Sequence, residues 1–168
     1  MKKSIDSNRI KIENLHTDFI WEVEQEPGCE AISLCYACGT CTAGCPVRAV
    51  SSRYNPRRII RQVITGQRDA VIQNDFIWLC SSCYTCQERC PQGVKITDIM
   101  VGLRNIAARE GFGPPSHQKQ KDLILKYGRL YEIDEFDNKK RRKVGLPAIQ
   151  SDASDLIQLQ KSIHGDLE

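Results

Sequence analysis

The sequence lacks any long hydrophobic run: none of its apolar stretches approaches the roughly 20 residues that a membrane-spanning helix needs. It begins MKKSIDSNRIKIENLH, which turns polar and charged where a secretory signal requires an apolar segment. Aromatic residues are few, eleven among 168, and 40% of all residues are hydrophobic, enough for one modest core. We therefore expect a cytoplasmic protein without a transmembrane helix.

Cysteine, in contrast, is abundant. The chain has nine cysteines, and eight of them lie between Cys35 and Cys90. A reducing compartment keeps thiols available as metal ligands and disfavours disulfides. Metal or redox chemistry is therefore the leading prediction, and it belongs to the middle third of the chain.

That middle third contains one motif twice. CYACGTCTAGCP spans residues 35–46 and CSSCYTCQERCP spans residues 80–91, so every cysteine and the final proline recur after 45 positions. Each copy reads C-x2-C-x2-C-x3-C-P, the run through which thiolates hold [4Fe-4S] clusters, with the fourth cysteine ligating the other cluster. We predict two [4Fe-4S] clusters, the first held by Cys35, Cys38, Cys41 and Cys90, and the second by Cys80, Cys83, Cys86 and Cys45.

Two other uses of the cysteines are less favoured. Zinc is usually held by separated C-x2-C pairs that complete one tetrahedral set, which differs from this spacing. A zinc-bound adaptor could use the basic run at 139–143 (KKRRK) on nucleic acid, but this run lacks interleaved aromatics and a known nucleic-acid module. We read it as a solvated face or a surface for an acidic partner.

The remaining chemistry-bearing residues form no recognisable site. His16, His117 and His164 are isolated and form no H-E-x-x-H arrangement. Cys29 is a spare ligand, a reactive thiol or a buried small hydrophobe, and the last reading is favoured. We predict no catalytic residue. Each oxidised cluster with its four thiolates carries a charge of roughly −2, which favours backbone amides nearby. The arginines at positions 48, 53, 57, 58 and 61 either tune the reduction potentials or are simply solvated.

Helices dominate the expected secondary structure. Asn55 and Pro56 predict the start of a helix whose apolar face includes Ile59, Ile60 and Val63, and Gly66 predicts its end. Thr97 predicts the cap of a second helix that ends at Gly111. Further helices are expected near 123–127 and over 153–163, Pro46 and Pro91 are suited to start helices, and residues 18–23 remain open between strand and helix. The fold class is therefore mainly α.

Three segments follow from these observations. Residues 1–28 form an N-terminal extension, residues 29–112 a ferredoxin-type domain with two clusters, and residues 113–168 a helical C-terminal docking extension. Nearly eighty residues follow the second motif without a cluster ligand of their own, which is more than cluster binding requires.

The two motifs, the NPRRIIRQ helix between them and the GxP turn downstream together resemble the C subunit of heterodisulfide reductase, over about residues 15–150. The resemblance implies an α-helical ferredoxin fold that relays single electrons between a flavin and iron–sulfur protein (the A subunit) and the catalytic B subunit. It also implies that this chain has no substrate site, since that family reduces disulfides at CCG motifs and no Cys-Cys pair occurs here. The alternatives are a stand-alone ferredoxin-type carrier and the iron–sulfur subunit of another dehydrogenase.

Overall fold

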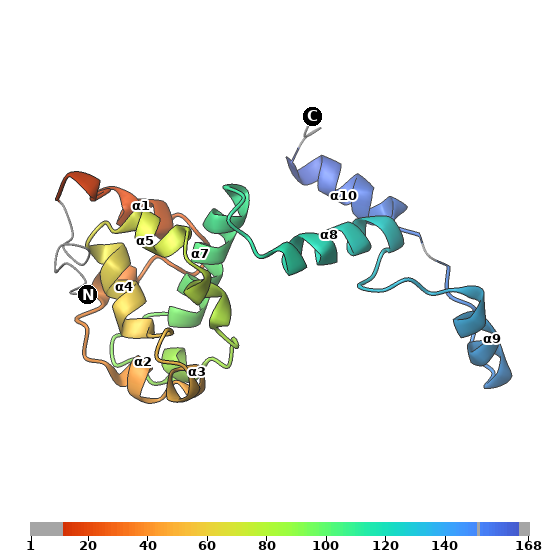
Figure 1. Ribbon diagram of the computed structural model, residues 1–168, viewed down its shortest axis with the longest axis horizontal. Helices are drawn as coiled ribbons and strands as arrows, with labels where there is room; N and C mark the ends of the chain where they lie inside the picture. The colour runs from red at the N-terminus through yellow and green to blue at the C-terminus, as the bar shows by residue number, and fades with distance from the viewer. Residues whose placement is uncertain (1–11, 151, 165–168) are drawn as a thin grey trace, which may run out of the picture. The chain divides into compact units, whose positions relative to one another are not determined.

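The computed structural model of the protein describes residues 12–150 and 152–164 (Figure 1). The regular structure within these ranges is helical and no β-strand occurs there, which confirms the mainly α prediction. The chain divides into two compact units, Met1–Gly113 and Pro114–Glu168, and each is considered by itself. Residues 1–11 of the predicted N-terminal extension lie outside the described residues. In the described ranges, no helix has the length and apolar character to cross a membrane.

The first unit is built from short helices around one long helix. Its α-helices are α1 (Phe19–Glu24), α2 (Thr40–Ala43), α3 (Pro46–Val50), α4 (Pro56–Ile64), α5 (Arg68–Ile72), α6 (Thr85–Glu88) and α7 (Ile96–Arg109). Within residues 12–113, three 3-10 helices accompany them, namely η2 (Ile12–Asn14), η3 (Ile32–Leu34) and η4 (Asp75–Leu79).

Helix α7 organises the core of this unit. Its buried residues recur at intervals of three and four, as on one face of a helix, and they include Ile99, Met100, Leu103 and Ile106. The helix packs against α1, α5, α6 and η4, while α4 packs against α1, α2, α5 and η3. Burying each such aliphatic side chain contributes about 1.5–3 kcal/mol, so this packing is what holds the short helices in place.

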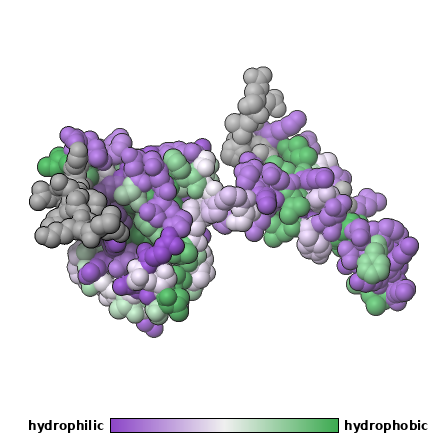
Figure 2. Space-filling model, in the orientation of Figure 1, coloured by the Kyte–Doolittle hydropathy of each residue, from purple (hydrophilic) through white to green (hydrophobic). Residues whose placement is uncertain are grey.

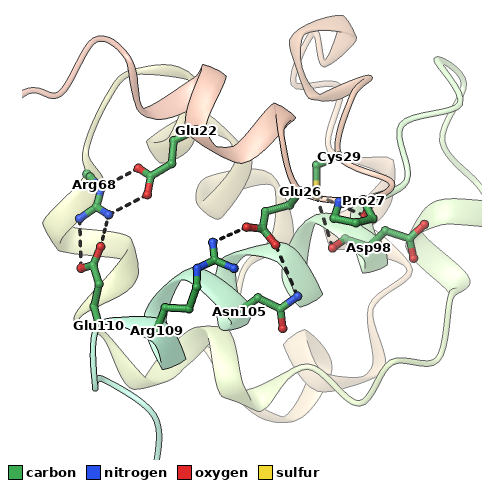
Figure 3. Close-up of polar contacts among 9 residues, drawn as sticks. All are labelled: Glu22, Glu26, Pro27, Cys29, Arg68, Asp98, Asn105, Arg109 and Glu110. Carbon is green, nitrogen blue, oxygen red and sulfur yellow. Dashed lines mark hydrogen bonds and ion pairs between the residues drawn. The ribbon is translucent and has the colours of Figure 1, made fainter. Parts of the chain in front are cut away.

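Ion pairs tie α1, α5 and α7 together at the edge of the core (Figure 3). The Arg68 guanidinium donates from Nε to Glu22 Oε2 at 2.7 Å and from Nη2 to Glu22 Oε1 at 2.8 Å, and it also binds Glu110. Nearby, the largely buried Glu26 pairs with Arg109. Three segments separated along the chain are thereby fixed by charge as well as by packing.

The helix boundaries at both ends of α4 confirm the sequence prediction. Asn55 Oδ1 accepts a hydrogen bond from Arg58 N at 3.0 Å, and Pro56 occupies the first turn. Gly66 follows the helix with φ +74°, and a β-carbon there would lie 2.6 Å from the carbonyl oxygen of His16. Gly111, with φ +81°, likewise follows the end of α7 as predicted.

Two predicted helix starts are wrong. Thr97 does not cap α7, because the helix already begins at Ile96 and the buried Thr97 hydroxyl lies 3.5 Å from Cys86 Sγ. Pro46 starts α3 as expected, whereas Pro91 opens a turn and no helix begins until Ile96. For Thr97, the contact with the second cysteine motif overrides the local preference.

Other segments were undecided or missed from the sequence. The open segment at 18–23 is helical, since Phe19 and Val23 on α1 are buried in the core. Neither α5 nor α9 (Glu135–Lys143) was predicted from the sequence. Helix α9 has almost no apolar periodicity, and its start is marked by Asp134, whose side chain accepts from Asp137 N at 2.9 Å.

The second unit contains α8 (Pro115–Tyr127), α9 and α10 (Ser154–His164), and its first and last helices confirm the predictions near 123–127 and over 153–163. Asn138 on α9 exchanges two hydrogen bonds with the backbone of Ile149, at 2.8 and 3.1 Å. Among the residues of this unit whose burial is described, only Ala153 is buried. This unit therefore has little core of its own.

Candidate metal centre

The two cysteine motifs fold into loops of the same backbone conformation. In the first, Ala37 and Gly39 have φ of +61° and +91°, and in the second, 45 positions later, Ser82 and Tyr84 have φ of +51° and +61°. Left-handed residues placed within a loop turn successive N–H groups toward one concave side, a conformation that binds anions and iron–sulfur clusters. Three non-glycine residues accept this unfavourable conformation, which points to a functional demand on the loops.

Each loop borders a pocket lined by four cysteines. The first pocket is lined by Cys35, Cys38, Cys41 and Cys90. The second pocket is lined by Cys45, Cys80, Cys83 and Cys86. Each encloses about 270 Å³ of space free of atoms, open solvent at the mouth included. Since α2 and α6 pack against each other, the fourth cysteine of each motif reaches the pocket of the other motif.

The first residues of two helices line both pockets. At the start of α4, Pro56 lines the second pocket and Arg57 the first. At the start of α7, Ile96 lines the first pocket and Thr97 the second. Because helix N-termini carry partial positive charge, both helices present favourable potential to a negatively charged group in either pocket.

The thiols differ in environment within each pocket in the same way. Cys38 and Cys83 are exposed, and the side chain and backbone N–H of Thr40 and of Thr85 lower the pKa of these two thiols, respectively. The hydroxyl oxygens lie 3.4 Å and 3.5 Å from the sulfurs. Cys41 and Cys86 are buried, and burial raises the pKa of both thiols. Thiolate ligands bound to a cationic centre would offset that burial.

The pockets differ in one wall. Arg57 is the only charged side chain among the described residues that line either pocket, and the other four arginines between 48 and 61 line neither. The second pocket instead has Tyr54, which is 1% exposed. Burial, followed by its hydrogen bond with Cys80, raises the pKa of the Tyr54 phenol, which stays neutral as a donor.

A residue that the sequence did not indicate supports the second loop. Arg104 on α7 donates from Nε to Ile77 O at 3.0 Å and from Nη2 to Cys80 O at 2.8 Å. Its guanidinium also lies over the Trp78 ring, 6.0 Å from the centroid. No sequence signal could have found it, since Arg104 is 24 positions from Cys80 and belongs to no motif.

Within the first unit, Cys29 and His16 line neither pocket. Cys29 is fully buried, as favoured from the sequence, and its Sγ lies 3.6 Å from Asp98 O (Figure 3). His16 Nε2 lies 4.0 Å from Asp69 Oδ2. All nine cysteines are free of disulfides. Among the described residues, no three histidine, cysteine or acidic side chains are placed to hold one metal ion.

The donor set fits the group that the spacing predicts. Each pocket offers four sulfur atoms, with backbone amides and helix N-termini beside them. Four thiolates are the usual ligands of a [4Fe-4S] cluster. The residues of both pockets are therefore suited to bind such a cluster.

Comparison with known proteins agrees with this chemistry. A family model described as a 4Fe-4S dicluster domain matches residues 31–94. The C subunit of the ferredoxin:CoB-CoM heterodisulfide reductase of Methanosarcina mazei is 44% identical over 131 residues, 76% of this chain and 78% of the relative. One of the CoB–CoM heterodisulfide reductase iron–sulfur C subunits of Methanocaldococcus jannaschii is 39% identical over 83% of this chain and 77% of the relative. The corresponding C subunit of Methanopyrus kandleri is 37% identical over 83% and 76%.

The match to the family model includes both cysteine motifs, and the matches to the three relatives cover most of each relative's length. The helical fold and the paired sulfur-lined pockets belong with a 4Fe-4S dicluster domain. The chain is a member of the family of heterodisulfide reductase C subunits, which are iron–sulfur proteins.

Proposed function

We propose that the protein relays single electrons through two [4Fe-4S] clusters as the non-catalytic subunit of a heterodisulfide reductase or a heterodisulfide reductase-like complex. Each cluster, when bound, takes up and releases one electron without breaking a bond. The chain holds the clusters by cysteine thiolates, directs amides at them, and keeps Cys41 and Cys86 away from water.

The observation that carries this proposal is the grouping of the cysteines. Three thiols of one motif and the fourth thiol of the other line each pocket, so Cys90 joins the first set and Cys45 the second. Such an exchange connects the two sites through the packed pair α2 and α6. It also supports a short separation between the clusters, as a relay requires.

Iron and sulfide content with EPR spectroscopy tests the number of clusters. Anaerobically purified protein should contain about eight irons and eight acid-labile sulfides per chain, as two cubanes require. After dithionite reduction, the EPR spectrum should show two interacting signals. Zinc without labile sulfide would overturn the proposal.

Serine substitutions test the exchange of ligands. Cys38→Ser should impair the first cluster and largely spare the second, whereas Cys45→Ser should impair the second although Cys45 belongs to the first motif. Cys29→Ser is the matched control, since Cys29 lines neither pocket. Loss of the first cluster in Cys45→Ser would contradict the assignment.

We further propose that the partners are a flavin and iron–sulfur protein like the A subunit of heterodisulfide reductase and a catalytic protein with CCG motifs like its B subunit. The relatives' names identify them as the C subunits of heterodisulfide reductases. The second unit supports a docking role, since it exposes large apolar side chains such as Tyr131, Phe136 and Leu159, and hydrophobic residues reach the surface there (Figure 2).

Truncation of the chain distinguishes cluster binding by the first unit from partner docking by the second. A chain ending at residue 113 should retain the iron and sulfide of the full chain but lose stable association with co-produced partner subunits in size-exclusion chromatography. Retained association by the truncated chain would contradict docking through the second unit, and would leave the cluster assignment intact.

A further inference from the structure

The charge distribution of the first unit is strongly one-sided around the first motif. Residues 31–68 contain six arginines and no aspartate, glutamate, lysine or histidine, in a chain whose formal net charge is only +3. Such a concentration of one sign creates a local potential that attracts an oppositely charged surface.

The fold neutralises only part of this charge. Arg68 is bound by Glu22 and Glu110, and Arg53 pairs with Asp75. The three arginines of α4, Arg57, Arg58 and Arg61, are exposed, and no acidic side chain among the described residues pairs with them. The exposed side of α4 therefore carries uncompensated positive charge.

A concavity lies beside this side of α4. It encloses about 610 Å³ free of atoms, open solvent included, and Arg53, Arg58 and Asn74 contribute polar groups to its lining. Ile59 and Phe76 provide apolar wall. This is the kind of surface into which a protruding acidic side chain of another protein can fit, with its aliphatic stem against the apolar wall.

The concavity is linked to the first cysteine motif. The hydroxyl of Thr42, next to Cys41, donates to Asn55 Oδ1 at 2.9 Å and accepts from Arg57 N at 3.0 Å. Asn55 lines the concavity and Arg57 lines the first pocket. A protein seated on α4 would therefore lie close to the first pocket.

Exposed apolar side chains stand on either side of Cys35, which lines the first pocket, and we call this region the mouth of that pocket. Tyr36, within the motif, is 60% exposed, and Leu34, one residue before Cys35, is 55% exposed. An electron-transfer interface typically combines a small apolar centre around the redox group with a charged rim that steers the encounter. Both parts are present here.

We propose that the arginine side of α4, the concavity beside it and the mouth of the first pocket form the docking surface for an electron-transfer protein with an acidic face. The inference rests on the proposed function, since it assigns the first pocket as the place where electrons are exchanged with that partner. One electron leaves the partner's reduced group and enters the chain, so the partner is oxidised and the chain is reduced, with no bond formed or broken.

The other basic segment of the chain is the natural comparison. Residues 139–143 (KKRRK) form most of α9, which belongs to the second unit. Lys139 and Lys143 are both exposed and lie four positions apart on α9, while Arg58 and Arg61 lie three positions apart on α4. Reversing either pair changes the net charge equally.

Stopped-flow reduction by a flavodoxin, a small flavin-bearing carrier with a strongly acidic surface, tests the proposal on the full chain with its clusters. Arg58→Glu with Arg61→Glu should lower the second-order rate about tenfold at low salt and flatten its dependence on ionic strength. Lys139→Glu with Lys143→Glu should stay within about twofold of the unaltered chain. Reduction by photoreduced deazariboflavin, a small uncharged reductant, should be equal in all three proteins and shows that the clusters are intact.

Three results would overturn the docking surface. These are equal losses in both double variants, a larger loss in the α9 variant, and an unaltered chain whose clusters deazariboflavin reduces but flavodoxin does not. Absence of clusters from the unaltered chain would instead count against the proposed function, so the two failures are distinguishable.

Discussion

A β-carbon at Gly102 would lie 2.8 Å from the sulfur of Cys29, closer than nonbonded atoms approach in folded proteins. Gly102 is buried in α7, and Cys29 precedes the first motif and is 0% exposed. Glu26 closes the same space, because its Cβ would lie 2.9 Å from the added carbon. The segment before the first motif is thus seated directly on the central helix.

Gly102→Ala should destabilise the protein although alanine favours helices. Overpacking destabilises a fold by about 1–3 kcal/mol, and the better helix propensity of alanine offsets up to about 1 kcal/mol of this. We therefore expect the free energy of unfolding to fall by about 1–2 kcal/mol. Urea unfolding followed by circular dichroism measures it. Gly113→Ala is the control, since a β-carbon there meets only Trp78 at 3.9 Å. The double variant with Cys29→Ala should lose less than the sum of the single losses, and simple additivity would argue against the contact.

The Cys29 thiol should be inert in the folded protein. Burial, followed by the charges of Glu26, Glu30 and Asp98, raises the pKa of Cys29 to about 12. In the unfolded chain its pKa returns to about 9, so folding keeps the thiol protonated and stability should fall as pH rises from about 9 toward 12. Iodoacetamide at pH 8 should label Cys29 only after unfolding, as mass spectrometry would show. Labelling of the native protein would contradict this environment.

Arg68 should be sensitive even to a conservative change. Its planar guanidinium bonds two carboxylates, Glu22 on α1 and Glu110 directly after α7, a geometry that a lysine ammonium does not reproduce. We expect Arg68→Lys to cost about 1 kcal/mol and Arg68→Ala about 2–3 kcal/mol in unfolding free energy, the latter because packing is lost as well. Arg142→Ala removes an exposed pair with Glu135 and should cost less than about 0.5 kcal/mol. Similar losses at both sites would show that Arg68 acts only as a surface charge.

The paired positions Gly39 and Tyr84 should respond in opposite directions. Both are left-handed, but only Tyr84 carries a side chain there. Gly39→Ala adds strain of about 1–3 kcal/mol and brings a β-carbon to 3.4 Å from Arg57 Nη1, so its cluster should be lost faster to a chelator. Tyr84→Gly should retain its cluster at least as well as the unaltered chain. The time course of absorbance loss with an iron chelator measures both, and faster loss in Tyr84→Gly would contradict the strain argument.

Arg57 and Tyr54 should each tune one reduction potential. Arg57→Gln removes a positive charge beside the first pocket, which disfavours the added electron. A charge interaction of about 0.5–1 kcal/mol corresponds to a lowering of about 20–40 mV for one electron. Tyr54→Phe removes the hydrogen bond to Cys80 and should lower the other potential by a comparable amount.

EPR-monitored redox titration resolves these two effects. Arg58→Gln serves as the control for Arg57→Gln. It removes the same charge from the next residue along the chain, and the Arg58 side chain lines neither sulfur pocket. It should shift the first potential less than Arg57→Gln does. Equal shifts of both signals in Arg57→Gln would contradict the placement of this charge at one pocket.

Features that depend on local chemistry were accessible from the sequence. Asn55, Pro56 and Gly66 mark the limits of α4 because a side-chain cap, a fixed φ and a left-handed residue act within a few positions. The spacing of the two motifs likewise predicted the cysteines that line the pockets and the chemistry they favour. The prediction that Thr97 caps a helix was wrong because a contact with a distant residue decides its position. Threonine is a common N-cap residue, but here its hydroxyl lies against Cys86, 11 positions away.

By itself, the sequence determined the repeated cysteine run, the helical character and the family, since these follow from residue types at fixed short spacings. Only the tertiary structure decided what surrounds each set of sulfurs. It places Arg57 at one pocket, Tyr54 at the other and Arg104 against the carbonyl of Cys80. The physical reason is that these neighbours are determined by how α4 and α7 pack against the cysteine loops. Packing between segments that are distant along the chain produces no periodic pattern of residues in the sequence.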